Sequence, residues 1–92
     1  MYAVTTTVTI AKDQFESSRK TLMQEVVPKV KQSPGFVKGY WSVSADHTQG
    51  LSLVIFDTKA NADNAAKMAR SMPAPAGVTM TGVEVREVVA ES

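Results

Sequence analysis

Cysteine is absent from this chain of 92 residues, and histidine occurs only once. Without thiols the chain has no disulfides and no thiolate nucleophile or metal ligand, and one imidazole is too few for a histidine metal centre. No stretch approaches the roughly 18 consecutive apolar residues of a membrane-spanning helix. The first residues also lack the basic start, apolar block and cleavage site of a secretory signal. We therefore expect a soluble, cytoplasmic protein without a metal or other cofactor.

An excess of charge of either sign is also missing. Ten Lys and Arg residues stand against nine Asp and Glu residues, which gives a formal net charge of +1, and the basic residues form no dense cluster. Nucleic-acid binding therefore has no electrostatic basis in this sequence. The apolar fraction of 43% and the charged fraction of 21% are typical of a globular domain. We expect a single domain over residues 1–92 that binds neither nucleic acid nor membrane.

The first half of the chain predicts one strand followed by one helix. Residues 2–10 alternate between two faces rich in Val and Thr, which is typical of a strand. Asp13 and Glu16 have the spacing of a capping box, and apolar residues at helical spacing then predict a helix over about 13–31. Pro28 lies inside this helix and lacks a backbone donor, so we expect a kink or a loosened last turn there.

The second half predicts strand, strand, helix and strand. Apolar and β-branched residues predict three further strands, at 36–45, 51–57 and 78–89. A helix over about 59–72, capped by Thr58, carries a narrow stripe of alanines, and a change in alternation near Gly82 predicts a bulge. The order βαββαβ predicts an α+β, ferredoxin-like fold: a four-stranded antiparallel sheet with two helices on one face.

Two strands of this sheet are apolar on both faces. In the second strand Phe36 and Tyr40 fall on one face by simple alternation, and Val37 and Trp41 on the other. Two helices can cover one face of a sheet, so the other face needs a cover as well. A two-fold dimer supplies one, because an isologous interface uses the same surface twice. We expect a homodimer in which Trp41 or Phe36 meets neighbouring valines across the interface.

Three segments resemble a known superfamily: Pro34-Gly35-Phe36 after the first helix, Gly39-Tyr40-Trp41 in the second strand, and Leu53-Val54-Ile55-Phe56-Asp57-Thr58 leading into the second helix. The whole chain resembles the dimeric α/β-barrel superfamily, in particular small proteins related to antibiotic biosynthesis monooxygenases. The resemblance implies strand order 4-1-3-2 and a barrel-like dimer. The superfamily includes cofactor-independent, quinone-forming monooxygenases, haem-degrading enzymes, dehalogenases, lyases and stress-associated proteins. Its haem-degrading members carry a histidine in the second helix, where this chain has none between Ala65 and Arg70, so we expect no haem.

Five residues are candidates for a ligand pocket. The resemblance implies that Trp41 borders a cavity between sheet and helices, and core packing is the alternative for this side chain. Tyr2 and Tyr40 are candidates for hydrogen bonds to a quinone-like oxygen, and Arg70 or Arg86 for stabilising an oxyanion. A strand-edge or surface position is the alternative for each of these four.

The remaining candidates are weaker. His47 lies in a polar hairpin loop beside Asp46, which favours a solvated residue over a catalytic base. Four methionines have the flexibility to line an adaptable apolar cavity or simply to fill a core: Met23, Met68, Met72 and Met80. Two functions remain open at this point. One is a small dimeric, cofactor-free monooxygenase acting on aromatic or polyketide-like molecules, and the other is a non-enzymatic, stress-related or ligand-binding dimer.

Overall fold

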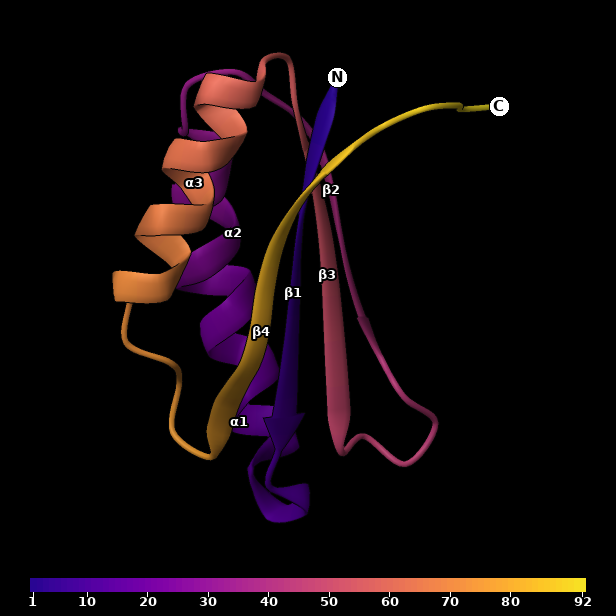
Figure 1. The fold of residues 1–92 in the computed structure, drawn as a ribbon. Helices are drawn as coiled ribbons and strands as arrows, with labels where there is room; N and C mark the ends of the chain where they lie inside the picture. Colours follow the sequence, from indigo (N-terminus) through magenta and orange to yellow (C-terminus); the bar gives the residue numbers. More distant parts are fainter.

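The computed structural model describes all residues 1–92 as a four-stranded sheet with its helices on one side (Figure 1). The strands are β1 (Tyr2–Ile10), β2 (Phe36–Val43), β3 (Gln49–Phe56) and β4 (Val78–Glu87). The helices are α1 (Phe15–Thr21), α2 (Val27–Lys31) and α3 (Lys59–Ser71). None of these helices is both long enough and apolar enough to cross a membrane.

The four strands are ordered β2-β3-β1-β4, and every neighbouring pair is antiparallel. Read from the other edge, this order is 4-1-3-2, so the predicted ferredoxin-like fold is confirmed. The uncharged strands β1 and β3 occupy the centre of the sheet, which is where a strand can be covered on both faces.

The first predicted helix is present, but it is not a regular α-helix throughout. A π turn over Leu22–Val26 joins α1 to α2, and the Val27 N–H bonds to the Leu22 carbonyl five residues earlier. Pro28 follows directly and sits in the first turn of α2, where its missing N–H is tolerated. The expected loosening near Pro28 therefore takes the form of a π turn that ends two residues before the proline.

The predicted capping box is wrong. A short 3₁₀ turn over Lys12–Gln14 precedes α1, and neither it nor α1 has a side-chain cap. Asp13 and Glu16 are both exposed. The start of this helical region is fixed instead by backbone bonds, from the Ala11 N–H to the Gly77 carbonyl at 2.7 Å and from the Gln14 N–H to the Ala11 carbonyl at 2.8 Å.

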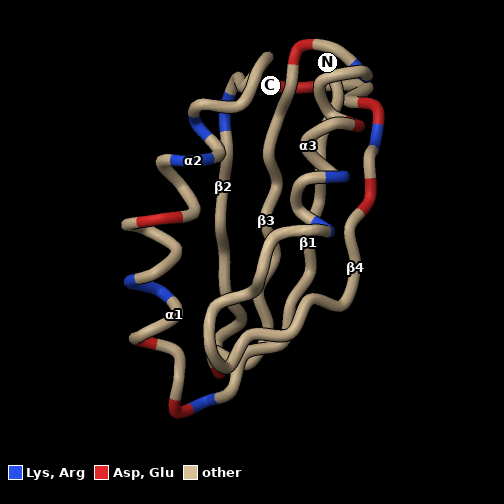
Figure 2. Tube along the Cα trace, turned by 90° about the vertical axis from the view of Figure 1, so that its left-hand side faces the viewer, with Lys and Arg blue, Asp and Glu red and all other residues tan.

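The third helix packs tightly against the sheet. Thr58 caps it as predicted, because its hydroxyl accepts a hydrogen bond from the Asn61 N–H at 3.2 Å. Ala62 and Ala66 are fully buried and let α3 approach the backbone of β1, β3 and β4 closely. The α1–α2 helix makes no comparably close approach to any strand. In Figure 2 it runs along the β2 side of the sheet, and α3 lies over β1.

Two irregularities in the pairing decide which side chains share a face. The bulge predicted near Gly82 is confirmed, because the β1–β4 register shifts between Thr7 and Val8. A second shift, between Phe36 and Lys38 in β2, was not predicted. It places Phe36 opposite Phe56 and on the same face as Trp41, so the simple alternation that separated Phe36 from Trp41 is wrong at this point.

The core lies between α3 and the sheet. Its buried members are Val4, Val54, Phe56, Ala62 and Ala66, and the rings of Phe36 and Phe56 meet edge to face with centroids 6.4 Å apart. Phe36 and Trp41 both pack against this core. They lie on the helix-facing side, so the expectation that one of them meets a partner through the outer face is wrong for this chain.

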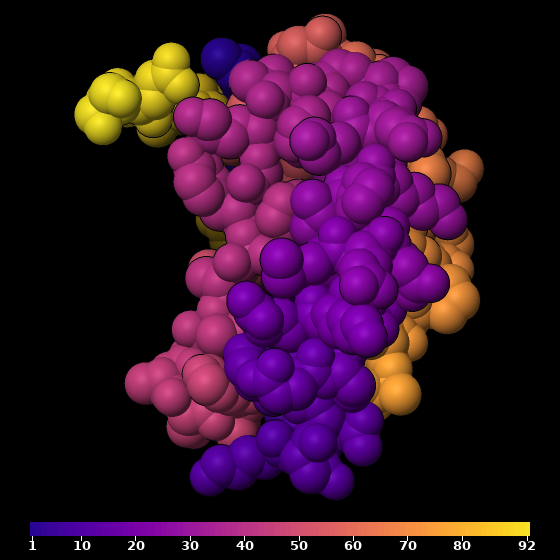
Figure 3. All heavy atoms as spheres, turned by 180° about the vertical axis from the view of Figure 1, so that it is seen from behind, coloured from indigo at the N-terminus to yellow at the C-terminus, as the bar shows by residue number.

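The outer face of the sheet carries other apolar side chains. Tyr40, Leu51 and Leu53 are exposed there, and Ile55 is half-buried beside them. After β4 the chain leaves the sheet, tied only by the bond from the Val88 N–H to the Met1 carbonyl at 3.0 Å. Its last residues project from the body of the molecule (Figure 3), and Val89 is 87% exposed.

Candidate ligand cavity

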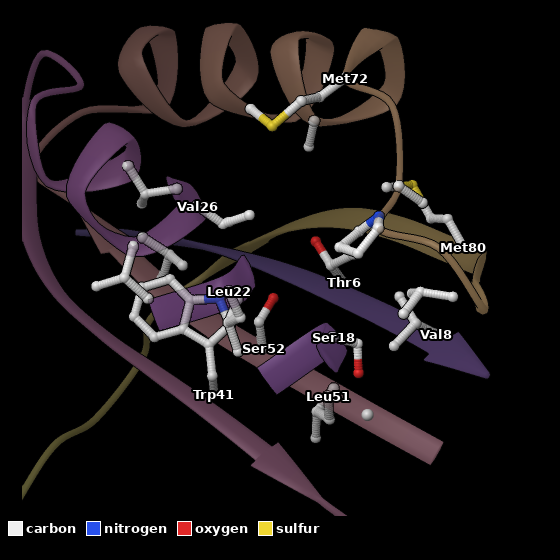
Figure 4. A pocket seen from close by; sticks show the side chains of 18 of the residues that line it. Thr6, Val8, Ser18, Leu22, Val26, Trp41, Leu51, Ser52, Met72 and Met80 are labelled. Carbon is white, nitrogen blue, oxygen red and sulfur yellow. The ribbon is translucent and has the colours of Figure 1, made fainter. Parts of the chain in front are cut away.

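A cavity of about 480 Å³ lies between the sheet and the helices (Figure 4). Its volume falls within the range of small-molecule binding sites, which is about 300 to 1,000 Å³. Hydrophobic residues make up 21 of the 31 residues around it, so most of a ligand placed there would contact apolar groups. This is the space left because α3 packs closely on the sheet and the α1–α2 helix does not.

Each wall of the cavity comes from a different part of the fold. The floor comes from the helix-facing side of β1 and β3, including Val8 and Val54, and Trp41 of β2 forms one side. The π turn forms the roof, and its Leu22 and Val26 line the cavity near Trp41 (Figure 4). The Pro73–Pro75 segment after α3 contributes to the lining as well. A π turn in a cavity wall is notable, because such turns occur frequently at functional sites.

The polar groups that face this cavity are few. Thr6 and Ser52 on the floor direct their hydroxyls into the cavity, and the Trp41 indole lies beside Ser52 (Figure 4). None of their polar atoms is both fully buried and without a hydrogen-bond partner. Ser18 on α1 is different, because its hydroxyl already donates to the Phe15 carbonyl at 2.9 Å.

The cavity has almost no ionisable lining. Neither β1 nor β3 contains a charged residue, as the uncoloured central strands of Figure 2 show. No Asp, Glu, His or Tyr lines the cavity, and its two cations, Arg19 and Lys29, are exposed residues of the first helical region. The chain contains no group of three or more potential metal ligands. The walls can therefore bind and orient an apolar molecule and donate neutral hydrogen bonds to it, but they offer no carboxylate or imidazole base.

The structure brings only one of the five candidate pocket residues into the lining. Trp41 lines the cavity, and Tyr2 packs against the core beyond it, opposite Phe56. Tyr40 lies on the outer face with its side chain exposed, 5.9 Å from the Lys38 ammonium. Arg70 and Arg86 likewise lie outside the lining.

The two arginines have local partners. The Arg70 guanidinium donates to the Val83 carbonyl at 3.2 Å, which ties the exposed side of α3 to β4. Arg86 pairs with Glu84 two residues earlier on the outer face of the sheet. Both pairs are exposed, so they hold side-chain positions more than they stabilise the fold.

Sequence reasoning did not identify Thr6 and Ser52. Each looked like one more β-branched or small polar residue in a strand, and only the register shows that they stand side by side. The four methionines, by contrast, all line the cavity, at Met23, Met68, Met72 and Met80. Met23 and Met68 are also exposed, so they lie at the cavity's rim.

The hairpin loop lies at the end of the molecule where α1 begins. His47 is exposed, and its ring stacks on Phe15, which is itself part of the cavity lining. Asp46 accepts hydrogen bonds from the hydroxyls of Ser44 and Thr48, both at 2.7 Å. These bonds, led by that from Thr48, lower the pKa of Asp46 from 3.8 to about 2.

Comparison with other proteins identifies the fold. No protein-family model and no curated protein matches the chain. Among solved structures, HapK from Hahella chejuensis has a TM-score of 0.72 at 8% identity, covering 100% of this chain and 96% of that one. A dimeric ferredoxin-like protein from an uncultured marine organism has a TM-score of 0.67 at 10% identity, covering 100% and 98%.

A third structure is the monooxygenase from the gene ActVA-Orf6 of Streptomyces coelicolor, in complex with the ligand Nanaomycin D. Its TM-score is 0.57 at 12% identity, covering 99% of this chain and 92% of that one. Sequence identities this low establish a common architecture and not a common activity. The protein therefore shares the ferredoxin-like fold of these solved structures, which is the fold that the resemblance in its sequence implied.

Proposed function

We propose that this protein binds a flat aromatic or polyketide-like small molecule in the cavity beside Trp41. The observation that carries the proposal is a preformed, mostly apolar space of about 480 Å³ with a small number of hydrogen-bonding groups on its floor. An indole offers a flat wall for ring stacking, and the methionines at Met23 and Met68 give the rim an adaptable shape. The Streptomyces monooxygenase of the same fold was solved with a ligand.

The activity we propose is cofactor-independent monooxygenation of a phenolic ring. In the balanced reaction the ring C–H and the phenolic O–H are lost, one oxygen atom of O₂ enters the ring to give a quinone, and the other oxygen atom leaves with the two hydrogens as water. Because the cavity has no carboxylate or imidazole, the phenolic proton must pass to solvent during the reaction and not to a side chain of the lining. The protein's part is to orient the ring and to hydrogen-bond its oxygen.

Oxygen uptake with a 1-naphthol probe tests this activity. We expect uptake to depend on the protein, and ¹⁸O₂ to place one labelled oxygen in the naphthoquinone product. Trp41→Ala removes one wall of the cavity and should lower both the rate and the binding, whereas Arg70→Ala, outside the lining, serves as the control. Binding of the probe with no oxygen uptake would rule out the monooxygenase.

The second candidate is a non-enzymatic ligand-binding or stress-related protein. The absence of acidic, imidazole and phenol groups from the cavity lining favours it, because most enzymes place a general acid or base beside the reacting atoms. It predicts tight binding without turnover. The single tryptophan gives a direct readout of binding, because Trp41 is the only source of indole fluorescence and lines the cavity itself.

We further propose that the protein is a homodimer formed through the outer face of its sheet. Tyr40, Leu51 and Leu53 expose apolar surface there, and the last residues of the chain project away from the body. A dimeric ferredoxin-like protein shares the fold, which supports this assembly. An isologous pairing would cover the exposed patch on both copies at once.

A further inference from the structure

Three hydrogen-bonding side chains form a single row across the helix-facing side of the sheet. Trp41 on β2 stands opposite Ser52 on β3, and Ser52 stands opposite Thr6 on β1. Opposite residues of antiparallel strands share a face, and neighbouring strands are about 4.8 Å apart. All three side chains line the cavity and point into it in Figure 4. We call this row the polar strip.

Apolar residues border the polar strip on both sides. Two residues toward one end of the strands, Val54 stands opposite Val4. Two residues toward the other end, Gly50 stands opposite Val8. All four of these residues line the cavity. The floor is therefore apolar except for one band that is a single residue wide and crosses three strands.

The groups of the polar strip are not used within the fold. Some other hydroxyls of this chain have partners, as Ser18 has in the Phe15 carbonyl, or as Thr7 has in the Thr81 hydroxyl at 2.9 Å on the outer face. The hydroxyls of Thr6 and Ser52 and the indole N–H of Trp41 form no such bonds, and each is open to the cavity. Their hydrogen-bonding capacity is left for a ligand.

The chemistry of the polar strip points to a neutral oxygen-bearing ligand edge. The indole N–H only donates, and the two hydroxyls donate or accept. The strip and the strands β1 and β3 contain no charged residue, and the two cations of the lining, Arg19 and Lys29, are exposed on the first helical region. A carboxylate or phosphate at the strip would therefore lose hydration without a charged partner within the strip itself. We infer that the polar strip binds carbonyl or hydroxyl oxygens along one edge of the ligand, while the apolar rows contact its ring.

This inference rests on the proposed function, because it assumes that a ring occupies the cavity. The test compares three probes of one ring size: naphthalene, 1-naphthol and 1-naphthoic acid at neutral pH. Equilibrium dialysis with chromatographic quantification gives each dissociation constant. We expect 1-naphthol to bind more tightly than naphthalene, and naphthoate to bind more weakly than 1-naphthol.

Single substitutions then show which side chains cause the preference for 1-naphthol over naphthalene. Ser52→Ala and Thr6→Val each remove one hydroxyl with little change in volume, and each should reduce the preference for 1-naphthol over naphthalene by about fivefold, a typical effect of losing one hydrogen bond. Naphthalene affinity should stay within about twofold of the wild type. Thr9→Val is the matched control, because it makes the same change on β1 but on the opposite, exposed face.

The outcomes separate the two proposals. If neither neutral probe binds the folded wild-type protein, the proposed function is wrong and the polar strip has no ligand. Two results would show that the cavity binds aromatic rings but that the polar strip does not bind their oxygens. One is equal binding of both neutral probes, and the other is an unchanged preference for 1-naphthol over naphthalene in Ser52→Ala and Thr6→Val. Circular dichroism of each variant confirms that it is folded, and the two independent substitutions guard against one of them failing to fold.

Discussion

The rings of Phe15 and His47 are stacked, with centroids 3.9 Å apart and planes inclined by 16°. The contact joins the loop between β2 and β3 to the start of α1, two segments far apart in the chain. His47 holds this position in a left-handed backbone conformation with φ of 61°, which is unfavourable for a residue with a side chain. At His47 the ring stack therefore stabilises the folded state, whereas the left-handed backbone conformation destabilises it.

Substitutions at His47 separate these two contributions. His47→Ala loses the stack and keeps the strained backbone, so we expect the free energy of unfolding to fall by about 1 kcal/mol. His47→Gly loses the stack but relieves the backbone by a similar amount, so its stability should stay close to that of the wild type. Urea denaturation measures both. Equal losses in the two variants would show that the backbone strain contributes nothing.

Ionisation of Asp46 makes the stability of the folded protein depend on pH in the acidic range. Its pKa is lowered to about 2 in the folded protein from an ordinary 3.8, so the ionised carboxylate stabilises the native state at pH values above about 4. This contribution is lost as the pH falls from 3.8 through 2. We expect Asp46→Asn to be less stable than the wild type at pH 7 and the difference to shrink by pH 2.5. Denaturation at the two pH values measures this, and a constant difference would contradict it.

Pro28 is expected to maintain the π turn. Pro28→Ala restores a backbone N–H and removes the steric pressure on the preceding turn, which favours a regular α-helix from α1 into α2. We expect the unfolding free energy to rise only slightly, because the first turn of α2 already tolerates the missing N–H. The roof residues Leu22 and Val26 should then turn relative to the floor, so ligand affinity should fall. Pro34→Ala, outside the helix, is the control, and a less stable Pro28→Ala would refute the prediction.

The outer face gives a test of the dimer. Leu53→Lys places a charge in the apolar patch, and a leucine fully buried in an interface contributes about 1.5 to 3 kcal/mol. We expect sedimentation velocity to show a dimer for the wild type and a monomer for this variant. Ala60→Lys, at an exposed position on α3, should remain dimeric. A wild-type chain that sediments as a monomer at high concentration would rule out the proposed assembly.

The alanines of α3 should differ sharply in their tolerance of larger side chains. Ala66 is fully buried against the sheet, so Ala66→Leu should lower the unfolding free energy by about 1 to 3 kcal/mol. Ala69 lies one turn later and faces the cavity, where a leucine has room. Ala69→Leu should therefore cost less stability but weaken ligand binding. Similar thermal midpoints for the two variants would contradict this view of α3.

Local patterns in the sequence were sufficient for most of the secondary structure. The alternation over residues 2–10 predicted β1 with its observed bounds, and Thr58 marked the start of α3. The capping box at Asp13 failed for a tertiary reason. The bond from Ala11 to Gly77, on a distant loop, fixes where the first helical region begins, and no local pattern contains that information.

The site was less predictable than the fold, because it depends on register. The shift beside Lys38 moves Phe36 to the face of Trp41, and strict alternation along β2 excludes that result. Thr6, Ser52 and Trp41 come from three strands, and their alignment follows from the pairing of those strands and not from any spacing within one segment. Trp41 could be identified in advance because a large aromatic residue stands out by itself.

The unequal packing of the two helical layers has a consequence for ligands of different size. Ala62 and Ala66 are fully buried between α3 and the sheet, so these two layers are in close contact. The α1–α2 helix instead rests around an open volume and contains a turn that is already irregular. We therefore expect a larger ligand to displace the α1–α2 helix and to leave α3 in place. Amide hydrogen exchange should accordingly slow on ligand binding in residues 15–31 and stay constant in residues 59–71.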